Sequence, residues 1–140
     1  MAPNPKPTKP NTTMSIEIKD IAFTGTPVTD MKRARAFYEG VLGLVVSKKF
    51  EQETFCWIEY EIGPGKGTLA IGNGMPQWQP SPQGTTLTLE VADLDAAIAH
   101  LKANNVAING GPFDTPVCRM AIIADPDGNS IGLHQCKAKA

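Results

Sequence analysis

An internal repeat constrains this chain more than any other feature of its sequence. A shift of 63 residues takes Asp30 to Asp93 and Ala34 to Ala97. In both copies the aspartate follows a segment of alternating apolar residues and precedes apolar residues at helical spacing, which predicts a strand and then a capped helix. Further strand-like segments come after each helix. The sequence therefore predicts two copies of one βαβββ unit, and because a single unit leaves one face of its sheet bare, the two copies must combine.

The expected elements define two modules and a connector in a single domain of residues 16–136. In the first module (16–72) we expect a helix that begins after Asp30 and ends before Gly43, and strands at 21–28, 45–50, 55–62 and 68–72. A Pro-rich connector (73–83) follows. In the second module (84–136) we expect a helix after Asp93 and strands at 85–91, 106–108, 119–124 and 130–135. The predicted fold class is α+β, with a curved mixed sheet around a cavity and the helices outside.

Residues 1–15 are expected to form a Pro-rich tail outside this domain. The segment carries prolines at positions 3, 5, 7 and 10 and almost no apolar residues. Such a segment buries too little surface to offset the entropy of ordering it. It also lacks the apolar stretch of a signal peptide.

Charge and composition exclude several classes of partner. The chain has 13 basic and 14 acidic residues, a net charge of −1, so we expect neither nucleic acid nor an anionic membrane surface as a partner. No apolar run reaches the ~18 residues of a membrane span. The three cysteines are an odd number, which argues against a secreted disulfide framework and favours a cytoplasmic location.

Two segments of the sequence resemble those of a known family. PVTDMKRARAFYEGVLGL, at the first helix, and ADPDGNSIGL, at the last turn, are similar to the vicinal oxygen chelate superfamily. That superfamily includes glyoxalase I, the bleomycin-resistance proteins and the extradiol dioxygenases. The resemblance covers about residues 18–135. It implies the duplicated fold, a small-molecule ligand and a homodimer, but the scaffold hosts many chemistries.

The resemblance also implies four positions at which metal-using members carry His, Gln or Glu. In this sequence the four positions are Phe23, Ala70, Thr86 and Gly132. Only the threonine offers an oxygen, and a neutral hydroxyl is a poor ligand for a divalent ion. We therefore expect no metal and no other cofactor.

The alternation of the strands predicts which side chains line the cavity. Leu87, Leu89, Ile131 and Leu133 are expected to face the helices, so residues of the other parity face the interior. The expected ligand-binding residues are Phe23, Trp57, Thr86, Thr88, Met120, Gly132 and His134. Trp78 in the connector is a further candidate for this lining. An apolar, partly aromatic lining suits a flat or amphipathic organic ligand, although core filling or a dimer contact explains the same residues.

His134 and Glu59 are the candidate catalytic residues. His134 can act as a general base or bind an anionic group, and the alternative is a solvated histidine at a strand end. Glu59, next to Trp57 on the same face, can bind a cation or move a proton, and the alternative is an exposed edge residue. Arg119 can reach a ligand carboxylate or form a surface ion pair. Cys118 and Cys136 are expected to be cross-strand neighbours with free thiols, and a Cys118–His134 nucleophile pair is a further alternative.

Three functions fit these observations. The first is a metal-free protein of the glyoxalase and bleomycin-resistance type that binds a small organic ligand. The second is an enzyme of the lyase, isomerase or dioxygenase type, which acts on a small oxygenated substrate by proton transfer or through a relocated metal. The third is a purely structural dimer. The sequence identifies no substrate.

Overall fold

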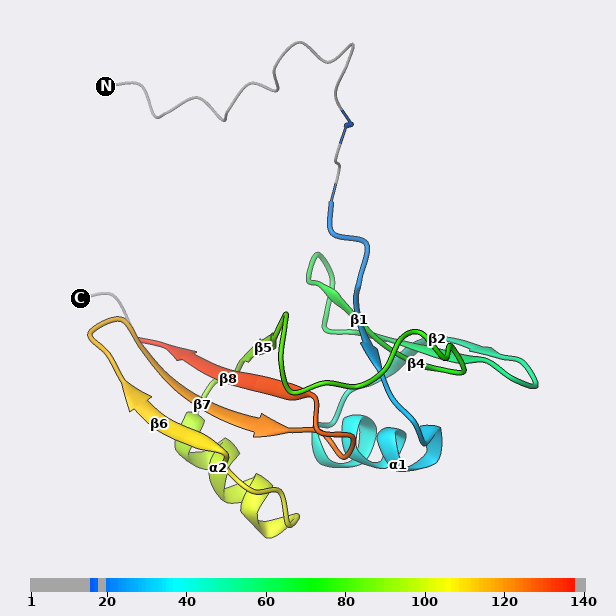
Figure 1. The fold of residues 1–140 in the computed structure, drawn as a ribbon. Coiled ribbons are helices and arrows are strands. Elements are labelled where there is room, and N and C mark those ends of the chain that lie inside the picture. The colour runs from blue at the N-terminus through cyan, green and yellow to red at the C-terminus, as the bar shows by residue number, and fades with distance from the viewer. Residues whose placement is uncertain (1–15, 18–19, 138–140) are drawn as a thin grey trace.

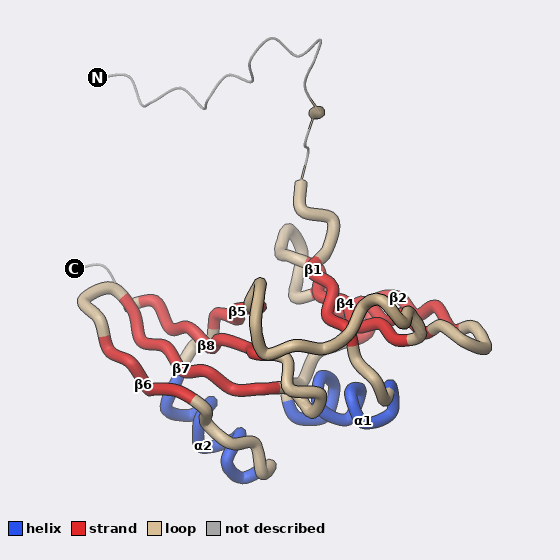
Figure 2. The backbone as a smooth tube through the Cα atoms, viewed as in Figure 1, coloured by secondary structure: helices blue, strands red, loops and turns tan. Residues whose placement is uncertain are grey.

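The computed structural model describes residues 16–17 and 20–137. The Pro-rich tail predicted for residues 1–15 lies outside these residues. The first module contains β1 (Thr24–Pro27), α1 (Met31–Arg35), η2 (Ala36–Val41), β2 (Val46–Glu51), β3 (Cys56–Glu61) and β4 (Thr68–Asn73). The second contains β5 (Leu87–Glu90), α2 (Leu94–Ala103), β6 (Gly110–Asp114), β7 (Cys118–Ala124) and β8 (Ser130–Cys136). The predicted α+β class and the βαβββ repeat are confirmed (Figures 1 and 2).

The eight strands form two four-stranded sheets with the same topology. The strand orders are β1-β4-β3-β2 and β5-β8-β7-β6. In each sheet the first strand runs parallel to its neighbour, and the other pairs are antiparallel. The pairing of Gly25 with Ala70 in the first sheet corresponds to that of Thr88 with Gly132 in the second. The repeat seen in the sequence is therefore also a repeat in register.

Each module begins its helix with the predicted aspartate cap. Oδ1 of Asp30 accepts the Arg33 N–H at 3.0 Å, and Oδ1 of Asp93 accepts the Ala96 N–H at 3.1 Å. The first helix widens after one turn into a π-helix, η2, before the chain leaves it at Gly43 with φ +76°. Both helices lie on the same side of the two sheets (Figure 1). The core is the layer between helices and sheets, with Ile58, Tyr60, Ile71, Ile123 and Ile131 almost fully buried.

One predicted strand is wrong. Residues 106–108 form no strand, and the edge strand β6 begins two residues later, at Gly110. The sequence Gly110-Gly111-Pro112 has the signature of a turn, but an edge strand tolerates proline because one side of its backbone needs no ladder partner. Gly111 is required here: its φ is +81°, and a Cβ would lie 2.7 Å from the carbonyl oxygen of Met120.

The turn DPDGN fastens the second module to the first. Asp125 is 4% exposed, and its carboxylate accepts hydrogen bonds from the Tyr38 hydroxyl at 2.8 Å and from Nδ2 of Asn129 at 2.9 Å. Nδ2 of Asn129 also donates to the carbonyl oxygen of Pro27 at 2.8 Å. Asp127 accepts from the Thr29 backbone and hydroxyl and pairs with Arg33. The segment predicted only as a hairpin turn is therefore also the joint between the modules.

We predict that Asp125→Ala destabilises the protein strongly. The change leaves the buried Tyr38 hydroxyl and Asn129 amide without their acceptor, which costs about 3 kcal/mol or more of unfolding free energy in urea denaturation. Tyr38→Phe removes one donor and keeps the carboxylate bonded, so it costs about 1 kcal/mol. Asp95→Ala, at an aspartate whose side chain is 74% exposed, serves as the control and changes stability by less than about 0.5 kcal/mol. Equal effects of Asp125→Ala and Asp95→Ala contradict this account of the joint.

Candidate ligand-binding site

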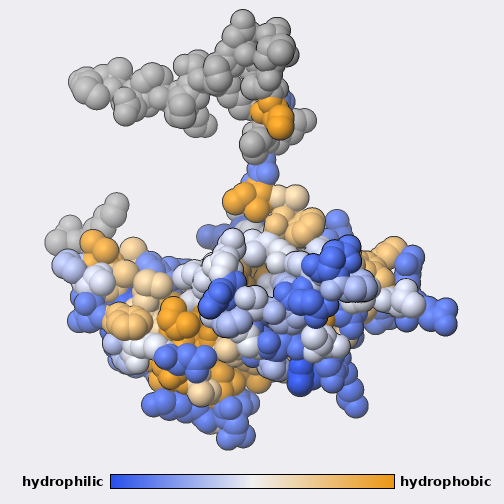
Figure 3. All heavy atoms as spheres, viewed as in Figure 1, coloured by the Kyte–Doolittle hydropathy of each residue, from blue (hydrophilic) through white to orange (hydrophobic). Residues whose placement is uncertain are grey.

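The strand parity predicted from the sequence separates a buried helix side from an open side of each sheet. Leu133 and Ile131 are 2% and 1% exposed, whereas the side chains of opposite parity contribute most of the partly exposed residues. Large apolar groups remain exposed, including Phe23 at 44% and Phe113 at 54%. Figure 3 shows apolar surface over both modules. The open side is where a ligand can meet the predicted residues.

Five aromatic side chains gather on the open side of the first sheet. We name this cluster the aromatic face; its members are Phe23, Phe50, Phe55, Trp57 and Trp78. Trp57 is at its centre, because Phe23 meets it edge to face at 4.9 Å between ring centroids, and Phe55 and Trp78 stack on it at 6.4 and 6.1 Å. The structure thus brings together Phe23 and Trp57 and adds the connector tryptophan named from the sequence.

Two glycines let the indoles lie against the sheet. A Cβ on Gly72 would come within 2.7 Å of the Trp57 ring and 3.1 Å of the Trp78 ring, and a Cβ on Gly25 would lie 3.4 Å from Trp78. Neither glycine has a positive φ, so the close approach of the rings, and not the backbone conformation, is what requires glycine at 72. The indoles of Trp57 and Trp78 therefore lie close against glycine backbone, which makes the aromatic face flat.

Glu59 supplies the polar group beside the aromatic face. The Trp57 Nε1–H donates to Oε2 of Glu59 at 2.9 Å, and Glu59 is partly buried. Its backbone neighbours are Ala70 on β4 and Lys48 on β2. The carboxylate is therefore held at the edge of the indole by one hydrogen bond and keeps further acceptor positions for a ligand.

The predicted residues of the second module form a separate group on β5, β7 and β8. Thr88 lies beside Gly132, where a Cβ would meet the threonine hydroxyl at 2.8 Å, and Met120 lies opposite His134. Thr86 is exposed and precedes β5. The Phe23–Trp57 group and this group are on different sheets of one chain.

Glu90 is the partner of His134 that sequence reasoning missed. Nδ1 of His134 lies 2.6 Å from Oε1 of Glu90, and Oε2 of Glu90 accepts the Cys136 N–H at 2.7 Å. These two contacts, the backbone one first, lower the pKa of Glu90. The carboxylate therefore orients the imidazole through Nδ1 and leaves Nε2 outside this contact. Continuing the parity of Thr86 and Thr88 by one step would have found this residue.

Other members of the open side were missed for identifiable reasons. Phe50 and Phe55 share the face of Trp57 because Phe50 is directly opposite it and Phe55 is two residues before it. The parity rule applied to the first hairpin would have included both. Phe113, opposite Met120, lies on β6, the strand that the sequence did not predict. Arg119 forms an ion pair with Asp95 at 3.0 Å, which is the alternative to ligand contact that the sequence left open for it.

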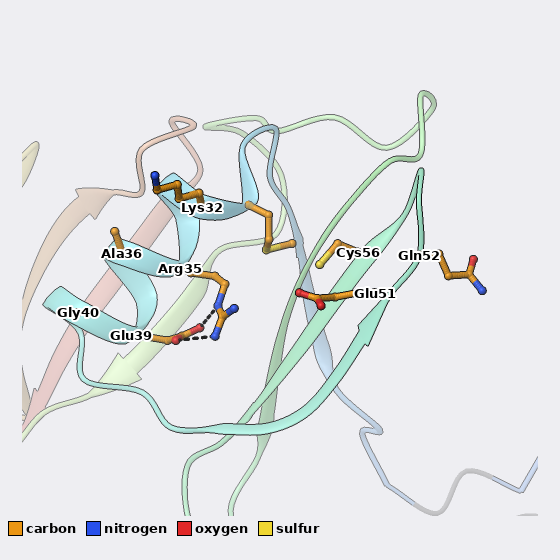
Figure 4. Close-up of a pocket in the computed structure, with 9 residues that line it drawn as sticks. Lys32, Arg35, Ala36, Glu39, Gly40, Glu51, Gln52 and Cys56 are labelled. Atoms are coloured by element: carbon orange, nitrogen blue, oxygen red, sulfur yellow. Dashed lines mark hydrogen bonds and ion pairs between the residues drawn. The ribbon is translucent and has the colours of Figure 1, made fainter.

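Two of the hollows on the protein involve few or none of the predicted site residues. A groove of about 810 Å³ lies between α1, η2 and the β2–β3 hairpin (Figure 4). Its most buried charge pair is already satisfied: Arg35 contacts Glu39 at 2.6 Å, and Glu39 accepts the Tyr60 hydroxyl at 2.7 Å. The arginine, then the tyrosine hydroxyl, keeps the pKa of Glu39 below its usual value. Arg35 and Glu39 are therefore already paired and are not free to bind a charged ligand in this groove.

The second hollow is an apolar crevice of about 530 Å³ between the modules. Leu42, Leu44, Leu69, Leu89 and Leu101 contribute to its walls. Thr88 and Glu90 also line it, whereas Phe23, Trp57, Met120 and His134 do not. The crevice and the aromatic face are thus distinct surfaces.

Comparisons with known proteins decide the family. The sequence matches the Glyoxalase/Bleomycin resistance protein/Dioxygenase superfamily over residues 20–133. The chain belongs to this superfamily. No curated protein matches the sequence. No helix among the residues that the structure describes is long and apolar enough to span a membrane.

Two similar solved structures come from Streptomyces sp. CB03234. TnmS3, described as an antibiotic binding protein, is 29% identical; the alignment covers 88% of this chain and 100% of that one, with a TM-score of 0.73. A glyoxalase/bleomycin resistance protein is 31% identical over 83% of this chain and 100% of that one, with a TM-score of 0.68. The trypanothione-dependent glyoxalase I of Leishmania major shares the fold at 21% identity, 84% and 87% coverage and a TM-score of 0.70.

The four positions of the superfamily's metal site do not fit a metal in this chain. Ala70 is fully buried and carries no donor atom, and Gly132 is covered by the Thr88 side chain. Phe23 presents its ring to Trp57. Within residues 16–17 and 20–137, no three His, Cys, Asp or Glu side chains are grouped so as to hold an ion. The side chains at these four positions therefore supply no set of donors suited to a divalent ion.

We predict that Gly72→Ala disrupts the aromatic face. The new methyl group overlaps the Trp57 ring, so the indole must move, which changes tryptophan fluorescence and near-ultraviolet circular dichroism and costs about 1–3 kcal/mol of stability. Gly67→Ala is the control because a Cβ there meets nothing within 4 Å. Identical spectra for both variants and the unmodified chain would show that Gly72 does not position the indoles.

Proposed function

We propose that this protein binds a flat, aromatic small molecule on the aromatic face without using a metal. The observation that carries the proposal is the stack of Phe55, Trp57 and Trp78 on glycine backbone, which presents π-faces and ring edges on the open side of the sheet. Offset stacking on such rings favours planar ligands over branched ones. The similarity to TnmS3, an antibiotic binding protein, supports antibiotic sequestration as the biological role.

Two polar side chains, Glu59 and His134, suggest how a ligand would be oriented. Glu59 lies at the indole edge and favours a cationic or hydrogen-bond-donating substituent. His134, oriented by Glu90, is the handle on the second module. Phe23, Thr86, Thr88, Met120 and Gly132 remain the proposed lining together with these residues. A cytoplasmic location stays a prediction from the cysteine content.

A homodimer is part of this proposal. The two groups of lining residues lie on different sheets of one chain, and each leaves large apolar side chains exposed, Phe50 at 53% and Phe113 at 54%. A second copy that covers the open sides would bury these rings and enclose the ligand. We therefore expect twice the chain mass of 15.0 kDa by light scattering at micromolar concentration. A monomeric mass under these conditions contradicts the dimer.

An enzymatic function is the second candidate, and the His134–Glu90 contact favours it. A carboxylate that fixes the tautomer of an imidazole is a common arrangement for general-base catalysis. Proton transfer by His134 would then act on a small oxygenated substrate bound near Met120, with Glu59 as the second group if both reach one substrate. Conversion of a bound compound that stops in His134→Ala would support this candidate, and unchanged compound after prolonged incubation would favour binding alone.

We predict that Trp57→Ala weakens binding of planar aromatic compounds about fivefold or more. Loss of a stacked indole removes roughly 1–3 kcal/mol of interaction, so the dissociation constant rises about 5- to 150-fold. The probes for calorimetry are ethidium, which is planar and cationic, and anilinonaphthalene sulfonate, which is anionic. Glu59→Gln weakens ethidium selectively if the carboxylate contacts the cation.

Two variants control this experiment. Trp57→Phe keeps a smaller aromatic ring and should retain an intermediate affinity. Ile62→Ala removes an apolar side chain that is 48% exposed, from the other parity of the same hairpin, and should leave affinity unchanged. If the two probes bind the unmodified chain and Trp57→Ala equally well, the ligand site lies elsewhere.

A further inference from the structure

Cys118 and Cys136 face each other across the last two strands of the second sheet. The two residues are direct register partners on β7 and β8, as expected from the sequence. Both cysteines are free thiols in this structure; Cys118 is 8% exposed and Cys136 is exposed. Opposite residues of an antiparallel pair project their side chains from the same face of the sheet, so the two thiols share a face.

The backbone hydrogen bonds show which kind of pair this is. The Cys118 N–H donates to the Thr115 hydroxyl at 3.0 Å, and the Cys118 carbonyl oxygen accepts the Thr115 N–H at 2.9 Å. Both backbone groups of Cys118 therefore point toward β6. The Cys136 N–H donates to Glu90, on the β5 side, and not to β7. Cys118 and Cys136 thus form a non-hydrogen-bonded pair, in which the Cα atoms approach to about 4.5 Å. That separation is within the range of about 4.4–6.8 Å that a disulfide spans.

Only weak contacts hold the thiols in their present rotamers. The Cys118 sulfur lies 3.4 Å from the Thr115 hydroxyl, and the Cys136 thiol lies 3.7 Å from the carbonyl oxygen of Lys137. These contacts offer little resistance to rotation of either thiol about χ1. Cys56, by contrast, lies on β3 in the other sheet, and burial raises the pKa of its thiol.

We propose that Cys118 and Cys136 are a redox-sensitive pair that closes to an intrachain disulfide under oxidants such as hydrogen peroxide. The exposed Cys136 thiolate attacks the peroxide to give a sulfenic acid and one water or hydroxide. The Cys118 thiol then attacks that sulfur, forms the S–S bond and releases a second water. Two thiols lose two electrons, and the peroxide is reduced to two waters. The bond would link the end of β8 covalently to β7, close to His134 and Glu90. Its formation does not depend on the proposed ligand.

The test treats the folded full-length chain with one equivalent of hydrogen peroxide. Remaining thiols are blocked with N-ethylmaleimide before denaturation and digestion. The reduced chain carries three thiols, and we expect one, Cys56, after oxidation, with three restored by dithiothreitol. Trypsin cuts after Lys102, Arg119 and Lys137, so the disulfide joins peptide 103–119 to peptide 120–137 and is found by mass spectrometry without reduction.

Single-cysteine variants distinguish the pair from other oxidation products. Cys56→Ser should still form the 103–119/120–137 species and go from two thiols to none. Cys118→Ser and Cys136→Ser should each abolish that species. Retention of three thiols, a 120–137 peptide linked to a second copy of itself, or sulfinic or sulfonic acid at Cys136 as the main product would each overturn the proposal.

Discussion

The buried carboxylate of Asp125 is the contact on which the arrangement of the two modules depends. It lies in the turn between β7 and β8 of the second module, yet one of its donors, the Tyr38 hydroxyl, comes from the helical segment of the first. Burial, then the charge of Asp125, raises the pKa of Tyr38, which favours the protonated hydroxyl as the donor. Because the joint sets one module beside the other, it places both helices on one side and leaves the open sides of both sheets available.

The fold could be predicted from the sequence because each copy of the repeat contains local signals for where its elements begin and end. The aspartate caps, the glycine stop and the alternating strands each arise from local chemistry, and each reappears at the predicted place. The failure at residues 106–108 has a local cause as well. A Gly-Gly-Pro segment has turn chemistry, and only its position at a sheet edge, which is a tertiary fact, makes it a strand.

For the candidate site, the sequence could predict only which side chains alternate to the same face of each strand. Parity alone placed Phe23, Trp57, Glu59, Met120 and His134 toward one shared interior. In the register, Trp57 and Glu59 alternate with Ile58 on β3, and Met120 lies opposite His134 on β7 and β8. Parity does not show how near two sheets come, so it could not reveal that these groups occupy separate sheets of one chain. Nor could it reveal that Trp78, from a connector without regular structure, stacks on Trp57. Such contacts depend on how the connector crosses the sheet, and no local pattern encodes them.

Replacing metal ligands with Phe, Ala, Thr and Gly changes what the scaffold can do. A metal site binds oxygen atoms of many ligands by charge, whereas an aromatic surface on bare glycine backbone selects for flatness. If ligands bind by stacking, as proposed, the Glu59 carboxylate at the indole edge would add charge selectivity without entering the stack. Under the proposed function, the frame that supports chelation in metal-using members would support recognition of ligand shape in this chain.

The account is tested most directly by the indole N–H signals of the ¹⁵N-labelled protein during titration with ethidium. The chain contains two tryptophans, Trp57 and Trp78, and both belong to the aromatic face, so the two signals report on that surface alone. We expect both signals to shift together and saturably as ethidium binds. Saturable binding that leaves both indole signals unmoved would contradict the claim that the aromatic face is the ligand site.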